Sequence, residues 1–256
     1  MAFTALMYHS LSDGRHPDTQ YPKYTTRRAL FREHLAALTD AGYELGSFRE
    51  LLESHDAAMP LPEKTCVLTF DDGHRSSLDL AEVMQDFGVT GTFFLTAGYC
   101  RERRDFLRRE EIQALAAEGF DFGTHGVTHR PLNALPPAEL KRELSESKSW
   151  LEDITGKAVK TMSLPAGQGS REVNAAAFAN GYRLVGTSRE AANGQLKVPG
   201  TVNRFVILAG HSPADVLKIA SASPGYVWAR RLRSMAIWLP KKILGTAHRT
   251  RQEGAR

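Results

Sequence analysis

The sequence predicts an α/β protein in which a distorted (β/α) barrel of seven or eight strands, TIM-like in plan, precedes a basic C-terminal helical tail. Two observations predict the barrel. Apolar runs of strand length alternate with helical patterns along the 256 residues, and a glycine ends most of these helical patterns, where a helix commonly stops. About eight such units fit a closed barrel of parallel strands, with a doubly wound open sheet as the alternative.

Runs rich in apolar and β-branched residues predict the strands. They are residues 3–8, 43–45, 66–70, 90–96, 120–124, 160–164, 182–186 and 204–208. Between them, apolar residues at helical spacing predict helices over residues 25–43, 76–88, 109–119, 136–156 and 171–181, and a further helix begins near 211–215. We expect Thr26 to cap the first helix and Gly42 to end it.

The net charge of +4 is unevenly distributed along the chain. Residues 223–256 hold eight Lys or Arg and one Glu, a net charge of +7, and the remaining residues carry −3. A nucleic-acid-binding protein usually carries its basic patch on the folded face, so we expect no nucleic-acid partner. The sequence therefore divides into a barrel over residues 1–222 and a basic amphipathic tail over 223–256.

The tail has two interpretations. Apolar residues recur at helical spacing until a proline interrupts them, and basic residues surround them. The tail is either a helix packed on the barrel or a peripheral contact with an anionic membrane surface. The N-terminus lacks the features of a signal peptide, and no apolar run reaches the roughly 18 residues of a membrane span. We expect a location in the cytoplasm or at the cytoplasmic face of the membrane. We also expect Cys66 and Cys100 to be reduced, buried thiols.

Two adjacent carboxylates end one predicted strand. In the stretch "LTFDDGH", Phe70 finishes the strand, Asp71 and Asp72 follow, and Gly73 makes the turn. In βα barrels, reactive groups gather at the carboxyl ends of the strands. A divalent cation would relieve the repulsion by neutralising one carboxylate, and the other could then take a proton from metal-bound water.

A second strand end carries two histidines. His125 and His129, in "GTHGVTH", are four residues apart and can face one point if the segment turns helically. Zinc accepts imidazole and carboxylate ligands, and catalytic zinc sites use three protein ligands with one open position. The two histidines with one of the aspartates would complete such a set, so the sequence predicts a divalent metal site.

These motifs resemble those of the polysaccharide deacetylases, carbohydrate esterase family four. "TFDDG" and "H-x-x-x-H" look like the first two family motifs, and the resemblance covers roughly residues 3–210, including "ALMYHSLS" and "GTFFLT". It implies a distorted βα barrel and metal-dependent removal of acetyl groups from sugars. It also implies that Asp71 is the catalytic base and that Asp72, His125 and His129 are the metal ligands, with Zn²⁺ favoured over Co²⁺, Ni²⁺ or Mn²⁺.

The third family motif departs from its usual form. Where the family has an arginine that orients the catalytic aspartate, "MSLPAGQG" has Ser163. Our hypothesis is that Arg204 enters from a neighbouring strand and replaces it; a surface ion pair is the alternative. A backbone N–H near Ala166 would help to hold the oxyanion.

The general acid has two candidates. The usual C-terminal histidine motif is missing, and His211 stands at a different spacing. His9 follows the first predicted strand in "LMYHS", which looks like the N-terminal signature of a branch resembling exopolysaccharide-associated deacetylases. We favour His9 as the acid that protonates the leaving amine, over His211 at a predicted helix start.

The resemblance implies de-N-acetylation of an amino sugar in a cell-surface polysaccharide or its precursor, by attack of metal-bound water on the acetyl carbonyl. The partner is then an acetylated glycan. The same residues would serve an O-acetyl esterase or an amidase acting on a non-sugar amide, because each has an accessible acyl carbonyl. A catalytically silent glycan-binding barrel is the alternative from a different class of protein.

Overall fold

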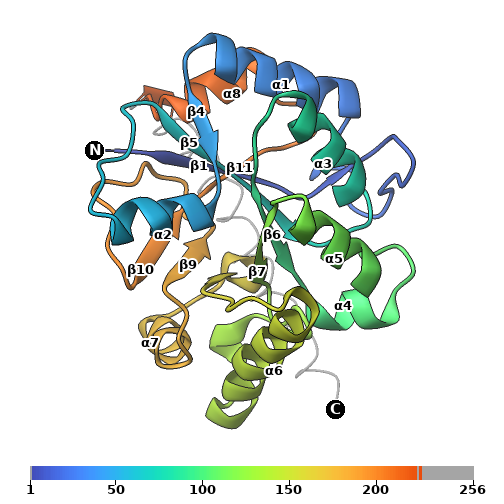
Figure 1. Cartoon of the computed structure of the whole chain (residues 1–256), viewed down its shortest axis with the longest axis vertical. Coiled ribbons are helices and arrows are strands. Elements are labelled where there is room, and N and C mark those ends of the chain that lie inside the picture. The colour runs from blue at the N-terminus through green and yellow to red at the C-terminus, as the bar shows by residue number, and fades with distance from the viewer. Residues whose placement is uncertain (1, 224, 227–256) are drawn as a thin grey trace, which may run out of the picture.

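A ring of parallel strands forms the centre of the protein in this computed structural model, which describes residues 2–223 and 225–226 (Figure 1). The strands follow the order β10-β9-β8-β7-β6-β5-β1-β11, with β4 beside β5, and β2 and β3 pair separately. Their bounds are β1 (Thr4–Tyr8), β2 (Ser10–Leu11), β3 (Thr25–Thr26), β4 (Glu44–Gly46), β5 (Thr65–Asp72), β6 (Thr92–Leu95), β7 (Asp121–Thr124), β8 (Thr161–Ser163), β9 (Leu184–Thr187), β10 (Gly200–Asn203) and β11 (Phe205–Val206).

One short segment brings the two ends of the sheet together. β10 pairs with β9, β11 pairs with β1, and a single residue, Arg204, separates β10 from β11. The segment 200–206 therefore changes partners at Arg204 and nearly closes the ring. The predicted barrel is confirmed, and the open sheet is excluded.

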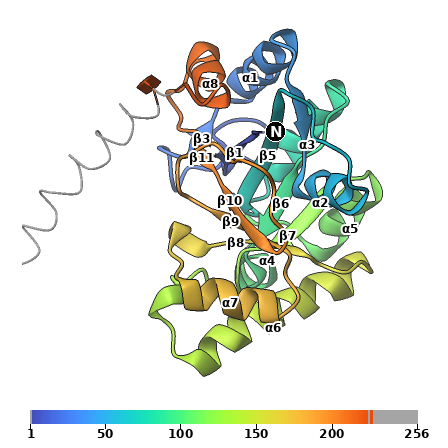
Figure 2. The ribbon, with the colours of Figure 1, turned by 90° about the vertical axis from the view of Figure 1, so that its left-hand side faces the viewer.

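The helices lie around the strands, as Figures 1 and 2 show. α1 and α8 lie side by side at one end of both views, and α6 and α7 lie at the other. The α-helices are α1 (Arg28–Asp40), α2 (Phe48–Asp56), α3 (Ser77–Asp86), α4 (Ala97–Glu102), α5 (Arg109–Ala117), α6 (Pro137–Thr155), α7 (Arg171–Ala179) and α8 (Pro213–Ala220), with short 3₁₀ turns η1 (Leu132–Ala134) and η2 (Pro165–Gly167).

The segments with helical or strand-like spacing of apolar residues form the predicted helices and strands. The following differences have local causes. Thr26 was wrong as the first helix cap: it lies in β3, and α1 begins after Arg27 in the N-cap position. α2 was missed although it begins with a capping box, in which Ser47 and Glu50 bond each other's backbone N–H. β10 was missed because Gly200–Asn203 is not an apolar run.

Some predictions concern residues beyond this description. The tail predicted over 223–256 lies outside the described residues except for Ser223, Gly225 and Tyr226. None of the helices within the described ranges is long and apolar enough to cross a membrane. Both cysteines are free; Cys66 is buried as predicted, whereas Cys100 is only partly buried.

Candidate metal centre and catalytic site

The backbone at the end of β5 turns both carboxylates toward one site. In a regular strand Asp71 and Asp72 would point to opposite faces. Asp72, however, has a left-handed φ of +77°, and the strand ends there. As a result the Asp71 Oδ2 and Asp72 Oδ1 atoms lie 4.0 Å and 3.5 Å from the same nitrogen, Nε2 of His125. A strained φ at a non-glycine residue is typical of functional sites.

The three predicted metal ligands lie close together. One donor atom from each of Asp72, His125 and His129 lies within 4.8 Å of the other two, and Asp72 Oδ1 is 3.2 Å from His129 Nε2. Ligand atoms about 2.0–2.2 Å from a tetrahedral zinc ion lie about 3.3 Å apart. The spacing of these donors is therefore close to that of a zinc site.

The oxygen of Asp72 supports a cation at this point. Asp72 Oδ1 is buried and makes no hydrogen bond of ordinary geometry within the described part of the chain, a costly state for a carboxylate oxygen. Burial raises the pKa of Asp72, but the contacts with His129 and His125 outweigh it and hold the pKa well below its usual range. The carboxylate is ionised, and a divalent cation would satisfy its orphaned oxygen. The three residues therefore fit a divalent metal.

The ring of His125 is oriented for coordination. Its Nδ1 lies 3.0 Å from the carbonyl oxygen of Ser163; because a carbonyl only accepts, Nδ1 carries the proton and Nε2 keeps its lone pair toward the site. Burial lowers the pKa of His125 to about 4, despite the opposing charges of Asp71 and Asp72. His125 is therefore neutral near pH 7, the state that binds metal.

The loop that carries His129 is held by a residue that the sequence analysis missed. Glu143 on α6 is buried, and its carboxylate accepts hydrogen bonds from the N–H groups of Val127 and Thr128 at 2.5 and 3.1 Å and from the Thr128 hydroxyl at 2.6 Å. His129 has a left-handed φ of +60°. Burial alone would lower the pKa of His129. The neighbouring Asp72 carboxylate raises it by more, so the pKa lies above its usual value.

The helical spacing of α6 could have revealed Glu143. Buried positions of this helix include Ser147, Leu151 and Ile154, and Glu143 precedes them at the same helical spacing. A charged residue on a core-facing stripe rarely stays buried without partners. The sequence gives the position but not the loop to which the carboxylate bonds.

Arg204 reaches Asp71 through the barrel interior. Its Nη1 and Nη2 lie 2.7 and 2.8 Å from the two carboxylate oxygens of Asp71, and its side chain is fully buried. A Cβ atom on Gly186 would lie 3.0 Å from the Arg204 Nε, so glycine makes room for the guanidinium. Burial raises the pKa of Asp71, but Arg204 outweighs it and the pKa is lowered. A buried bidentate pair replaces the surface ion pair that was the alternative.

Ser163 connects the candidate base, Asp71, to the candidate metal ligand His125. Its hydroxyl donates to Asp71 Oδ1 at 3.2 Å and also contacts Nδ1 of His125. Two residues after this end of β8, Pro165 lies against Gly126, and Ala166 follows with a left-handed φ of +54°. The segment after β8 thus meets the histidine loop at Pro165.

The two candidate acids lie in different surroundings. His9 directly follows β1, its Nδ1 is buried without a hydrogen bond among the described residues, and its charge contributes to lowering the pKa values of both Asp71 and Asp72. His211 lies in the loop before α8, where its Nδ1 accepts from the Leu208 N–H at 3.1 Å. His9 therefore interacts electrostatically with both carboxylates.

A strand-end group of two histidines and a carboxylate, beside a second ionised aspartate, is typical of metal-dependent hydrolases built on βα barrels. The sequence profile of the polysaccharide deacetylase family matches residues 58–185, half of the chain. The chain belongs to the polysaccharide deacetylase family.

Individual relatives agree with this assignment. The chain is 29% identical over 191 residues to YxkH of Bacillus subtilis (strain 168), covering 73% of this chain and 64% of YxkH. It is 38% identical over 74 residues to the poly-β-1,6-N-acetyl-D-glucosamine N-deacetylase of Escherichia coli (strain K12), covering 29% of this chain and 11% of that enzyme. The chain thus spans less than two thirds of the length of either protein.

A solved structure shares the fold. The deacetylase PplD of Streptococcus pyogenes, in complex with acetate, superposes with a TM-score of 0.74 at 22% sequence identity, covering 86% of this chain and 98% of PplD. At this identity the likeness shows that the two chains have the same barrel.

Proposed function

We propose that this protein removes N-acetyl groups from an amino sugar in a cell-surface polysaccharide or its precursor. The family to which the chain belongs and the similarity to a poly-β-1,6-N-acetyl-D-glucosamine N-deacetylase support this substrate class. We also propose that the protein belongs to the branch of exopolysaccharide-associated deacetylases, which the stretch "LMYHS" resembles.

We propose the following roles for the side chains of the candidate site. Asp72, His125 and His129 would hold a divalent ion, Zn²⁺ in the first instance, which would supply Lewis-acid polarisation of the acetyl carbonyl and a lowered pKa for water. Asp71, fixed by Arg204, takes the proton from the attacking water. His9 gives a proton to the departing amine nitrogen, and a backbone N–H near Ala166 receives the oxyanion.

The single observation that carries the proposal is the contrast between two neighbouring carboxylates. Asp72 has a buried oxygen without a hydrogen bond among the described residues, beside two histidine nitrogens. The carboxylate of Asp71, the preceding residue, instead accepts hydrogen bonds from Arg204 at both of its oxygens. One carboxylate is thus available to a metal, and the other is kept ionised and oriented for proton transfer.

The test is acetate release from a panel of N-acetylated and O-acetylated oligosaccharides, with and without a chelator. We expect release from N-acetylated glucosamine oligomers, loss of release with chelator, and recovery on adding Zn²⁺. Asp71→Asn should abolish turnover while the protein still binds one equivalent of metal. Asp56→Asn, at an exposed carboxylate paired with Arg183, is the matched control and should leave turnover unchanged.

Other outcomes separate the alternatives. Release from O-acetylated members alone would favour an esterase. Simple N-acetyl amides, added to the panel, test the other alternative, and release from them alone would favour a non-sugar amidase. Binding of glycans without release from any member would favour a glycan-binding barrel and contradict the proposal. Peripheral membrane contact through residues 223–256 stays a prediction, tested by co-sedimentation of the full chain with anionic vesicles against a chain that ends at residue 222.

A further inference from the structure

Three tyrosines lie around the candidate site, and the proposed reaction uses none of them. The ring centre of Tyr24 is 5.0 Å from that of His9, and the Tyr99 ring stacks on His129 with the centres 5.7 Å apart. Tyr21 forms a turn with Tyr24, whose N–H donates to the Tyr21 carbonyl at 2.9 Å. These aromatic contacts therefore extend from His9 on one side of the site to His129 on the other.

A polar cluster links the segment that carries Tyr21 to Tyr99. Gln20, which precedes Tyr21, donates to Asp105 at 2.6 Å and accepts from Arg103 at 2.7 Å. The guanidinium of Arg103 lies 4.9 Å from the centre of the Tyr99 ring.

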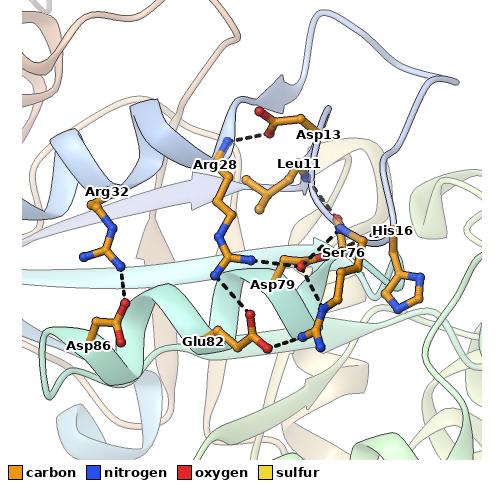
Figure 3. A network of polar contacts seen from close by, with 10 residues as sticks. Leu11, Asp13, His16, Arg28, Arg32, Ser76, Asp79, Glu82 and Asp86 are labelled. Atoms are coloured by element: carbon orange, nitrogen blue, oxygen red, sulfur yellow. Dashed lines mark hydrogen bonds and ion pairs between the residues drawn. The ribbon is translucent and has the colours of Figure 1, made fainter.

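The loop that carries Tyr21 and Tyr24, residues 12–24, is anchored on α3 (Figure 3). Asp79 of α3 is fully buried and accepts from the N–H groups of Arg15 and His16, both at 3.3 Å. The guanidinium of Arg28 donates to the same carboxylate at 3.1 Å. A loop fixed in this way loses little conformational entropy when a ligand binds.

Tyr21 is nevertheless exposed. Among the described residues, the two large apolar side chains that are mostly exposed are Tyr21 at 58% and Met59 at 62%. Met59 precedes β5 and lies at the amino ends of the strands, whereas Tyr21 lies at their carboxyl ends with the candidate site. An exposed aromatic ring on an anchored loop beside a catalytic site indicates a binding surface.

We propose that Tyr21 forms a carbohydrate subsite that binds the pyranose ring next to the acetylated sugar. The rings of Tyr24 and Tyr99 already pack against His9 and His129, and they connect this subsite to the candidate site. The inference rests on the proposed function and extends it, because it requires a substrate of several sugar units. The positive C–H groups on the face of a pyranose ring suit the negative face of an aromatic ring, and the phenol hydroxyls can bond sugar hydroxyls. The subsite would lengthen the substrate contact beyond the reacting acetyl group.

The experiment compares a β-1,6-linked pentamer of N-acetylglucosamine with the monomer. Binding is measured by isothermal titration calorimetry in the Asp71→Asn background, and KM and kcat are measured in the active enzyme. We expect Tyr21→Ala to raise the Kd and the KM of the pentamer by about three- to tenfold, with a smaller change in kcat, because the stacking contact lies away from the reacting acetyl group. The monomer should be affected less than the pentamer.

Two further variants make the result specific. Tyr21→Phe keeps the ring and should restore pentamer binding to within about twofold of the wild type. Met59→Ala, the matched exposed residue at the other end of the barrel, should leave both Kd values unchanged. An unchanged pentamer Kd in Tyr21→Ala, an equal loss for monomer and pentamer, or no binding of the pentamer by the parent protein would overturn the subsite. Pentamer binding that depends on Tyr21, without acetate release by the wild type, would support the subsite and contradict the proposed reaction.

Discussion

Arg204 and Asp71 form a bidentate ion pair inside the barrel, with N–O distances of 2.7 and 2.8 Å and almost no exposure of either side chain. Arg183 and Asp56 form a pair of similar geometry, 2.6 Å at both contacts, on the surface. An exposed pair contributes little to stability, whereas removing one partner of a buried pair leaves an uncompensated charge. The two pairs therefore provide a matched comparison within one chain.

Arg204→Ala should lower the proposed deacetylase activity strongly, without abolishing it, and should destabilise the protein. Without the guanidinium, burial raises the pKa of Asp71, so the acidic limb of the pH profile of kcat/KM moves to higher pH. The free energy of unfolding should fall by about 3–5 kcal/mol. Denaturant titrations and pH–rate profiles would measure the two effects.

Arg183→Ala is the control for this prediction, with an expected loss of at most about 1 kcal/mol and an unchanged pH profile. Arg204→Lys keeps the charge but not the bidentate geometry and should recover stability better than turnover. Turnover in Arg204→Ala equal to that of the wild type would show that Asp71 needs no orienting partner.

His9 and His211 can be separated as candidate acids by paired substitutions. His9→Ala should lower kcat about 10²–10⁴-fold on amide substrates, the usual contribution of general acid catalysis. It should affect activated aryl esters much less, because a phenolate leaves without a proton. His211→Ala should leave kcat unchanged, since its ring bonds the backbone of Leu208. Equal effects on amides and aryl esters would contradict the acid role of His9.

Glu143 should set metal affinity without touching the metal. Glu143→Ala would leave the N–H groups of Val127 and Thr128 without their acceptor and free the loop that carries His129. We expect metal affinity to fall about 10–100-fold, the usual effect of losing a group that supports a ligand. Titration with Co²⁺, followed by its visible absorption, would measure this independently of turnover.

Two variants on the same helix test the cause of this effect. Glu143→Gln should retain affinity within about threefold, because the amide oxygen can accept from both N–H groups and the amide NH₂ can donate to the Thr128 hydroxyl. Glu146→Ala, at a half-exposed position paired with Arg101, should bind Co²⁺ like the wild type. A wild-type Co²⁺ affinity in Glu143→Ala would show that the loop that carries His129 keeps its conformation without Glu143.

The barrel and the candidate metal-binding residues were accessible from the sequence because each has a local signature. Helical and strand periodicities gave the elements, and the adjacent aspartates and the H-x-x-x-H spacing stood at strand ends. The left-handed φ of Asp72, by contrast, depends on the turn into Gly73 and on contacts with β6. Sequence spacing alone could not show that both carboxylates would face His125.

Long-range contacts explain what the sequence could not settle. The pairing of Arg204 with Asp71 joins residues 133 positions apart, and it depends on the space left by Gly186 on a third strand. The sequence therefore suggested Arg204 but left a surface ion pair equally open. The bonds of Glu143 to the histidine loop similarly needed the docking of α6 against that loop.

The last prediction concerns Asp121, at the start of β7 and away from the candidate site. Its carboxylate accepts from the Arg49 N–H at 3.1 Å and from the Thr92 hydroxyl at 2.7 Å, both at Oδ2. Burial raises the pKa of Asp121 to about 6, despite these bonds. In the unfolded chain the pKa of an aspartate is about 3.9, so the folded protein binds this proton more tightly.

The sign of the pH dependence follows from that difference. The contribution of Asp121 to stability is complete below about pH 4 and is lost as the pH rises toward 6, since the folded protein must then bury a charge. Asp121→Asn keeps an oxygen acceptor for both donors and carries no charge. Relative to the wild type, its free energy of unfolding should therefore rise between pH 4 and 6, by on the order of 2 kcal/mol, and stay level above that. Urea titrations across this range, with Asp153→Asn at an exposed carboxylate as the control, would measure the difference, and a constant difference at every pH would show that Asp121 is ionised throughout.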